Sequence, residues 1–226
     1  TLSSSSAASD VYKRQILAYE LTGAGLDVVA IERGEWRDTA TDFPPAWAPD
    51  ELRYGVRLDL FQRPAQGTVT LRNNMSQTAL PVRQFVSFLP GNGVGGAGVH
   101  WNGMTYRFLP TDFQLRSHVT QRYGAKAIPD DMTIQDWGVT YEEMEPYYDK
   151  FEKLAGISGK AGNLNGQIQA GGNPFEGARA SEYPTKPTTP TYGPSLFAKA
   201  AESLGYHPFH VPSGLSLIHI SEPTRP

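Results

Sequence analysis

The fold of this chain is decided by the stretch Pro90-Gly91-Asn92-Gly93-Val94-Gly95-Gly96-Ala97-Gly98-Val99-His100-Trp101-Asn102-Gly103-Met104. Five glycines fall within eight residues, and a His-Trp-Asn cluster follows them. Because glycine lacks a Cβ and tolerates positive φ, such a loop can bring its backbone against a ligand. Successive amides in it can form an anion-binding concavity. A flexible linker has a similar composition, but the interleaved apolar residues and the closing cluster favour a cofactor loop.

The two ends of the chain differ in character from its middle. Residues 1–15 and 215–226 resemble translated sequencing adapters, and we interpret them as adapter-like, non-native ends. Natural disordered tails are the alternative. Because non-native segments are excluded from fold reasoning, the interpretation rests on residues 16–214, which we expect to be an internal piece of a longer protein.

Composition excludes several classes of function. The net charge of −3 gives no basis for a nucleic-acid partner, which requires a basic stripe. The sequence contains no cysteine, so neither a disulfide nor a thiolate-bound metal is expected, and we predict no metal site. No window approaches the ~20 apolar residues of a membrane span. A small-molecule substrate is the expected partner.

Residues 16–214 begin with a predicted helix that is followed by a short apolar run. Residues 16–25 have helical spacing of apolar positions, with Gly25 as the stop, and residues 26–31 are typical of a strand buried on both faces. Glu32 follows the strand, as the ribose-binding acid does in a dinucleotide-binding βαβ unit. Counting back about 20 residues places the expected Gly-x-Gly-x-x-Gly within residues 9–15, where adapter-like sequence stands. The alternative for Glu32 is a solvated acid at a strand end.

The middle of the chain gives weaker signals. Residues 67–72 alternate like a strand, and residues 83–89 suit a strand or a covering segment. Residues 102–109 are expected to continue from the glycine loop as a helix or an irregular stretch. Residues 161–192, rich in Gly, Pro and Thr, are predicted to form a long loop, and residues 194–204 a last helix that stops at Gly205.

Residues 140–156 predict two consecutive helices. Thr140 and Glu143 have capping-box spacing. Pro146 would break a continuous helix but suits the first turn of a second one, and Gly156 is the expected stop. An apolar face is expected to pack in the core, with substrate contact as the alternative; it comprises Met144, Tyr147, Tyr148, Phe151 and Leu154.

Three blocks of the sequence together resemble one enzyme family. Residues 94–103 resemble the second glycine motif of the glucose–methanol–choline (GMC) oxidoreductases, which oxidise alcohols and sugars with FAD. Residues 136–148 resemble the family's Asp-Trp-Pro-x-Ser/Thr-Tyr block, with Gly138 in place of the proline, and residues 16–34 resemble its FAD-binding helix and strand. Within the family the resemblance is strongest to the large subunits of sugar and sugar-acid dehydrogenases of the gluconate dehydrogenase type.

The resemblance implies a fold and a set of cofactor contacts. The fold is expected to be α/β: an incomplete, Rossmann-like FAD-binding domain over residues 16–214, with part of a substrate or cap region. By position, Glu32 matches the ribose acid, residues 92–98 match the loop along the diphosphate and ribityl chain, and Asn102 and Gly103 match residues beside the flavin's reactive edge. The predicted cofactor residues are Glu32, Asn92, Gly93, Gly95, Gly96, Gly98, His100, Asn102, Gly103 and Met104.

His100 has two interpretations. The Gly-Gly-x-x-x-His-Trp pattern also resembles pyranose oxidase, in which the motif's histidine is bonded to the flavin's 8α-methyl carbon. His100 is therefore a candidate for covalent attachment, and the alternative is a histidine hydrogen-bonded near the ring. The remaining histidines of residues 16–214 are expected to be structural or exposed; these are His118, His207 and His210.

The resemblance also bears on catalysis and partners. No catalytic residue is assigned, because the family's catalytic His–Asn or His–His pair lies well beyond residue 214. The parent enzyme is expected to transfer a hydride from a CH–OH group to flavin N5, and the chain alone is expected to be inactive and poorly folded. A complex with a cytochrome and a small subunit, on the periplasmic face of a membrane, is implied for the parent. The alternatives are an FAD- or NAD-dependent oxidoreductase of another family and a non-catalytic glycine-loop module.

Overall fold

The computed structural model describes residues 8–32, 34–36, 38, 70–72, 75–81, 91, 93–96 and 103–214. The chain divides into two compact units, Thr1–Asn102 and Gly103–Pro226, and each is described by itself. The described helices and strands are α1 (Ala8–Gly23), β1 (Thr70–Leu71), β2 (Leu80–Pro81), α4 (Pro110–Phe113), α5 (Leu115–Tyr123), η3 (Ala125–Ala127), α6 (Tyr141–Ala155), β3 (Asn163–Leu164), β4 (Gln167–Ile168) and α7 (Tyr192–Ser203).

Helix α1 ends as the sequence predicts. Gly25 adopts φ +80°, and its amide donates to the carbonyl of Thr22 at 2.9 Å. The amide of Leu26 donates to the carbonyl of Leu21 at 3.0 Å, which completes a Schellman motif. The helix begins at Ala8, inside the stretch interpreted as adapter-like.

The predicted buried strand at residues 26–31 is not formed among the described residues. No described strand pairs with this segment, and Val29 and Ile31 are 85% and 89% exposed. A strand buried on both faces needs neighbouring strands to pair with, and the described strands of this unit, β1 and β2, pair with each other instead. Its only ladder is the antiparallel β1–β2 pair, in which Thr70 lies opposite Pro81; β1 falls within the strand expected at residues 67–72.

Helix α6 is a single helix, so the prediction of two helices is wrong. The capping box is confirmed: the Glu143 amide donates to Thr140 Oγ1 at 3.2 Å, and the Thr140 amide donates to the Glu143 carboxylate at 2.7 Å. Pro146 is the sixth residue of the helix and removes only the hydrogen bond to the carbonyl of Glu142. A single missing bond close to the N-terminus is tolerated. Gly156, at φ +64°, is the expected stop.

The predicted apolar face of α6 is only partly correct. Tyr147 and Leu154 are 67% and 48% exposed. The helix instead buries Tyr141 and Glu152, which lie on one face with Glu145 and Tyr148 at spacings of three and four residues. That face contacts two buried arginines, Arg107 and Arg179. Because it includes charged residues, the spacing of apolar side chains along the helix did not identify it.

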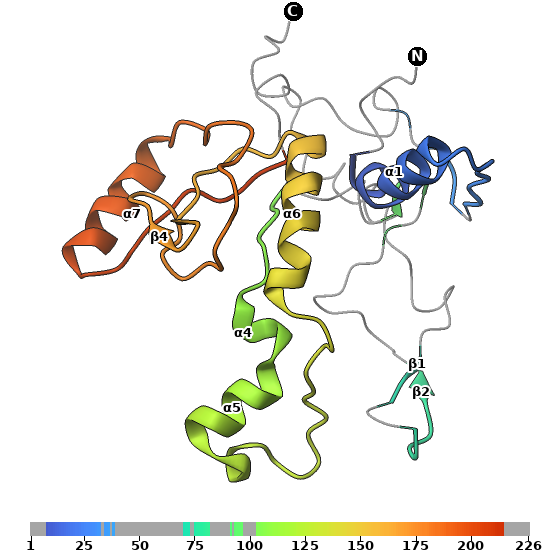
Figure 1. The fold of residues 1–226 in the computed structure, drawn as a ribbon, viewed down its shortest axis with the longest axis horizontal. Helices are drawn as coiled ribbons and strands as arrows, with labels where there is room; N and C mark the ends of the chain where they lie inside the picture. The colour runs from blue at the N-terminus through green and yellow to red at the C-terminus, as the bar shows by residue number, and fades with distance from the viewer. Residues whose placement is uncertain are drawn as a thin grey trace, which may run out of the picture. The chain divides into compact units, whose positions relative to one another are not determined.

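Four chain segments of the second unit are joined by backbone pairing. Met104 pairs with Ser213, which also pairs with Ser158, and Ser158 pairs with Thr185. Residues 161–192 are therefore not one long loop, since they contain the β3–β4 hairpin and this last pairing. Figure 1 shows the hairpin and α7 beside α6, with α4 and α5 continuing from the end of α6 at which Tyr141 lies. Helix α7 and Gly205, at φ +80°, confirm the last predicted helix and its stop.

Candidate functional site

In the first unit, the turn after Glu32 packs directly against the glycine loop. The amide of Val94 donates to the carbonyl of Glu35 at 2.8 Å. A Cβ added to Gly34 would lie 2.2 Å from the backbone nitrogen of Gly93, so only glycine fits there. The structure therefore brings together the predicted ribose acid and the predicted cofactor loop, two segments about 60 residues apart in the sequence.

The glycine loop itself is a tight turn. Gly93, Gly95 and Gly96 have φ values of +149°, +107° and +52°, which favour glycine. The amide of Gly96 donates to the carbonyl of Gly93 at 2.9 Å. The amides of Val94 and Gly96 are thus already engaged within the protein, so the predicted anion-binding concavity does not include these two. Because its glycines have no Cβ, this turn lets a ligand come close to the backbone.

Glu32 is half-buried and directly follows residues 26–31. Its Oε1 accepts a hydrogen bond from the amide of Gly34 at 3.0 Å. This hydrogen bond holds the Glu32 carboxylate against the turn that follows it. Gly34 of the same turn packs against Gly93 of the glycine loop. A carboxylate held in this way can accept hydrogen bonds from a polyhydroxylated ligand.

In the second unit, residues 103–109 leave the loop as an extended segment, the irregular stretch expected at residues 102–109. Gly103 is buried at φ +84°, and its carbonyl accepts from the Gly214 amide at 2.7 Å. The Thr105 amide donates to the carbonyl of Pro212 at 3.0 Å. These bonds fix the start of the segment.

The extended segment has two different faces. Gly103 and Arg107 are buried and Thr105 is half-buried, whereas the intervening residues are exposed. This period of two is that of a strand. The outward residues are apolar or aromatic, and they are Met104, Tyr106 and Phe108, which are 46%, 52% and 50% exposed.

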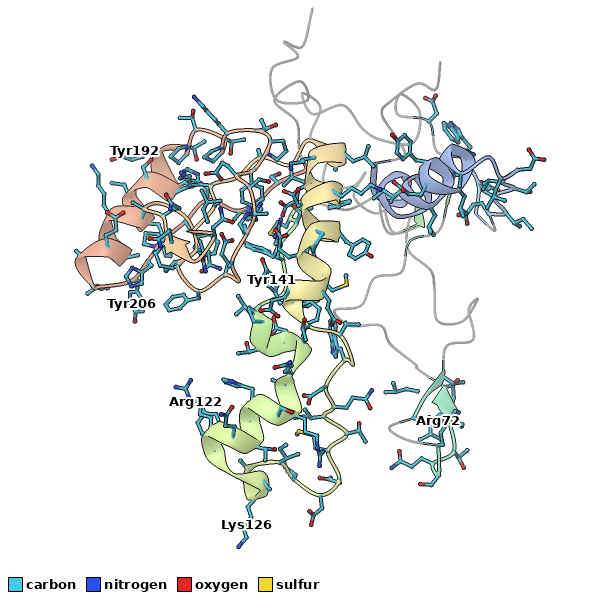
Figure 2. The ribbon with its side chains drawn as sticks, in the orientation of Figure 1. Arg72, Arg122, Lys126, Tyr141, Tyr192 and Tyr206 are labelled. Atoms are coloured by element: carbon cyan, nitrogen blue, oxygen red, sulfur yellow. The ribbon has the colours of Figure 1, made fainter. Side chains whose placement is uncertain are left out.

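A buried ionic network holds the inward face. Arg107 makes two bonds of 2.8 Å to the Glu152 carboxylate through Nε and Nη2. Its Nη1 donates to Tyr141 Oη and to Glu145 Oε1, each at 3.1 Å. Arg179 Nη2 also donates to Glu152 Oε2, at 2.5 Å, and the Arg179 guanidinium lies 3.7 Å from the centre of the Tyr183 ring. Figure 2 labels Tyr141 where α6 meets α4.

Burial and ion pairing shift the pKa of several groups in this network. Burial alone would lower the pKa of Arg107, but the bonds and charge of Glu152 keep it above its ordinary value. Burial raises the pKa of Tyr141 and of Tyr183. Burial also raises the pKa of Glu176, although the amides of Gly162 and Asn163 bind its carboxylate. The Arg107 guanidinium therefore stays charged, and the phenols of Tyr141 and Tyr183 stay neutral at neutral pH.

Several predicted site residues lie outside the described residues, namely Asn92, Gly98, His100 and Asn102. His207 lies edge-on to Phe175, with ring centres 6.0 Å apart, and is exposed, while His118 and His210 are half-buried, in agreement with structural or surface roles. Sequence reasoning missed Arg107, Glu152 and Arg179. Isolated charges far apart in the sequence give no periodic signal, so nothing in the pattern pointed to them.

Within the described residues, no group of acidic or histidine side chains is arranged to hold a metal ion. No described helix combines the length and apolar character needed to cross a bilayer.

Comparison with known proteins gives related enzymes. No family model matches the chain. The gluconate 2-dehydrogenase flavoprotein of Pantoea cypripedii is 50% identical over 201 residues, which are 88% of this chain and 33% of that protein. The fructose dehydrogenase large subunit of Gluconobacter japonicus is 31% identical over 53% of this chain and 18% of its own length. The 2-methyl-1,2-propanediol dehydrogenase of Mycolicibacterium austroafricanum is 27% identical over 83% of this chain and 29% of its own length.

The chain belongs to the GMC-type oxidoreductases. It spans about a third of the length of the gluconate 2-dehydrogenase flavoprotein that it matches. Its helices and small sheets are compatible with the α/β class of this flavoprotein family. The predicted family resemblance is confirmed, including its gluconate dehydrogenase character.

Proposed function

We propose that the full-length protein is an FAD-dependent dehydrogenase that oxidises the CH–OH group of a sugar, a sugar acid or another alcohol. The 50% identity to a gluconate 2-dehydrogenase flavoprotein supports the class of reaction. The observation that carries a cofactor site is the contact between the Glu32 turn and the glycine loop, where a Cβ on Gly34 would meet Gly93. One extended dinucleotide can touch both segments there.

Each residue of the site has a proposed role toward FAD. The Glu32 carboxylate accepts hydrogen bonds from the hydroxyls of the adenosine ribose. The turn at Gly93–Gly96 and its neighbours Asn92 and Gly98 lie along the diphosphate and the ribityl chain. His100, Asn102, Gly103 and Met104 lie beside the flavin ring, where hydrogen bonds tune its electronic properties. FAD, when bound, supplies the hydride acceptor at its N5 atom.

The wider assembly is also a proposal. A covalent bond from His100 to the flavin is one arrangement, and a histidine hydrogen-bonded near the ring is the other. The group that accepts the substrate's hydroxyl proton is proposed to lie beyond residue 214. The subunit named in the fructose dehydrogenase relative supports a parent enzyme that works in a complex, for which we propose a cytochrome and a small subunit at the periplasmic face of a membrane.

The reaction can be tested by flavin reduction. The full-length enzyme is purified, and gluconate is added without oxygen. We expect the yellow flavin absorbance to bleach with gluconate and to remain with an equal concentration of acetate. A coloured enzyme that no sugar, sugar acid or alcohol bleaches would overturn the proposed reaction. Acid precipitation then tests His100: the colour stays with the protein if the flavin is covalently bound, and passes into solution if it is not.

A further inference from the structure

We propose that Tyr106 contacts the polyhydroxylated substrate beside the flavin, and that the buried ion pair of Arg107 with Glu152 fixes Tyr106 in that position. This inference rests on the proposed function. It assigns a substrate-contacting residue on the chain segment that begins at the predicted flavin-edge residues Asn102 and Gly103 and includes the predicted cofactor residue Met104.

Strand geometry places Tyr106 near the reacting end of the site. Along an extended chain, side chains two residues apart point to the same face, with Cα atoms about 7 Å apart. Met104 and Tyr106 share the outward face of the segment and are 46% and 52% exposed. With the predicted cofactor residue Met104 against the flavin, Tyr106 lies about one sugar-ring length further along the same face.

The chemistry of Tyr106 suits a sugar or a sugar acid. Its ring is fixed edge-on to Phe209, with ring centres 6.4 Å apart and an interplanar angle of 86°. No described residue forms a hydrogen bond with its hydroxyl group. An aromatic ring with a polar tip can pack against C–H groups and also hydrogen-bond a hydroxyl. Phe108 lacks that polar tip, and its ring packs against Trp137 at 5.0 Å.

The ion pair of Arg107 with Glu152, on the opposite face of the segment, determines which side chains point outward. A shift of one residue would reverse the two faces of the segment. The bidentate contact of Arg107 with Glu152, at 2.8 Å through each nitrogen, and the pairing of Met104 with Ser213 prevent that shift. Arg107 is therefore a positioning residue, and Tyr106 is the residue that meets the substrate.

The test compares tyrosine variants of the full-length flavoenzyme. The Kd for gluconate is measured from the change it causes in the flavin spectrum under conditions without turnover, and flavin content is measured in parallel. We expect Tyr106→Ala to raise the Kd about tenfold and Tyr106→Phe about threefold, with unchanged flavin content. The matched control is Tyr147→Ala, which removes a tyrosine that is 67% exposed on α6 and should leave the Kd unchanged.

The outcomes separate this inference from the proposed function. A colourless wild-type enzyme overturns both. A coloured enzyme in which Tyr106→Ala binds gluconate like the wild type, or in which Tyr147→Ala weakens binding equally, overturns the role of Tyr106 alone. Loss of flavin from Tyr106→Ala also overturns it, since the residue would then support the cofactor. If Tyr106→Ala does not fold, an unchanged Kd in Tyr106→Phe decides against the inference.

Discussion

Glu152 compensates two buried guanidinium groups at once. Its side chain is 3% exposed, as is that of Arg107, and that of Arg179 is fully buried. Removing its charge takes the bidentate partner from Arg107, which keeps only Glu145 at 3.1 Å, and the nearest carboxylate from Arg179, which keeps only Glu176 at 4.0 Å. Losing one partner of a buried ion pair costs about 3–5 kcal/mol. We expect Glu152→Gln to lower the free energy of unfolding of the full-length enzyme by that amount in urea titrations.

The control for Glu152 is an exposed ion pair. Lys160 and Glu182 lie 2.6 Å apart, with side chains 36% and 39% exposed. Such pairs contribute about 0–1 kcal/mol, so Lys160→Met should change the unfolding midpoint little. Equal effects of the two substitutions would contradict the importance given to burial.

Gly34 tests the contact between the two predicted cofactor segments. Alanine at this position would place a Cβ against the backbone of Gly93, which cannot move aside as a flexible side chain can. We expect Gly34→Ala to cost about 1–3 kcal/mol at this contact and to reduce the flavin affinity of the full-length enzyme about tenfold or more. Gly193→Ala is the control, because its Cβ would meet nothing within 4 Å. Unchanged flavin affinity in Gly34→Ala would show that the contact does not serve the cofactor.

At the scale of elements, the capping box of α6 can be tested against a matched helix. Thr140 accepts a hydrogen bond from the Glu143 amide, whereas Thr191, at the same position before α7, makes no side-chain capping bond. Thr140→Ala should therefore lower the free energy of unfolding by about 1 kcal/mol, and Thr191→Ala should not. The measurement is the urea midpoint followed by helical circular dichroism. Equal shifts in both variants would exclude a specific role for the cap.

Local signals predicted the ends of helices well and their packing poorly. The stops at Gly25, Gly156 and Gly205 and the cap at Thr140 depend on neighbouring residues, so the sequence contains all the information needed. The single helix through Pro146 and the burial of Glu152 depend on partners such as Arg107, which is 45 residues away from Glu152. The contact of Gly34 with Gly93 joins residues that are even further apart in the sequence. Only the family resemblance suggested that both segments meet one ligand.

At the scale of the whole molecule, buried tyrosines should limit stability at high pH. Burial raises the pKa of Tyr141, Tyr148 and Tyr183 above the ordinary value of 10.0. These phenols ionise near that ordinary value in the unfolded chain and at higher pH in the folded one. Their contribution to stability is thus fully present below about pH 10 and is lost as pH rises through the folded-state values.

The alkaline transition can be followed by circular dichroism together with tyrosinate absorbance. We expect helical signal and buried-tyrosine ionisation to change together above about pH 10. The prediction fails if all eleven tyrosines of the chain titrate near their ordinary pKa while the helical signal stays constant.

The central claim is that one FAD contacts both the Glu32 turn and the glycine loop, and flavin binding by Glu32 variants of the full-length enzyme tests it most directly. The wild type should retain about one FAD per chain. Since hydrogen bonds to a charged group contribute about 1.5–3 kcal/mol, Glu32→Ala should bind FAD about tenfold to a hundredfold more weakly. Glu143→Ala, which alters only the cap of α6, should bind FAD like the wild type. A wild type without flavin, or a Glu32→Ala variant with undiminished affinity, would contradict the claim.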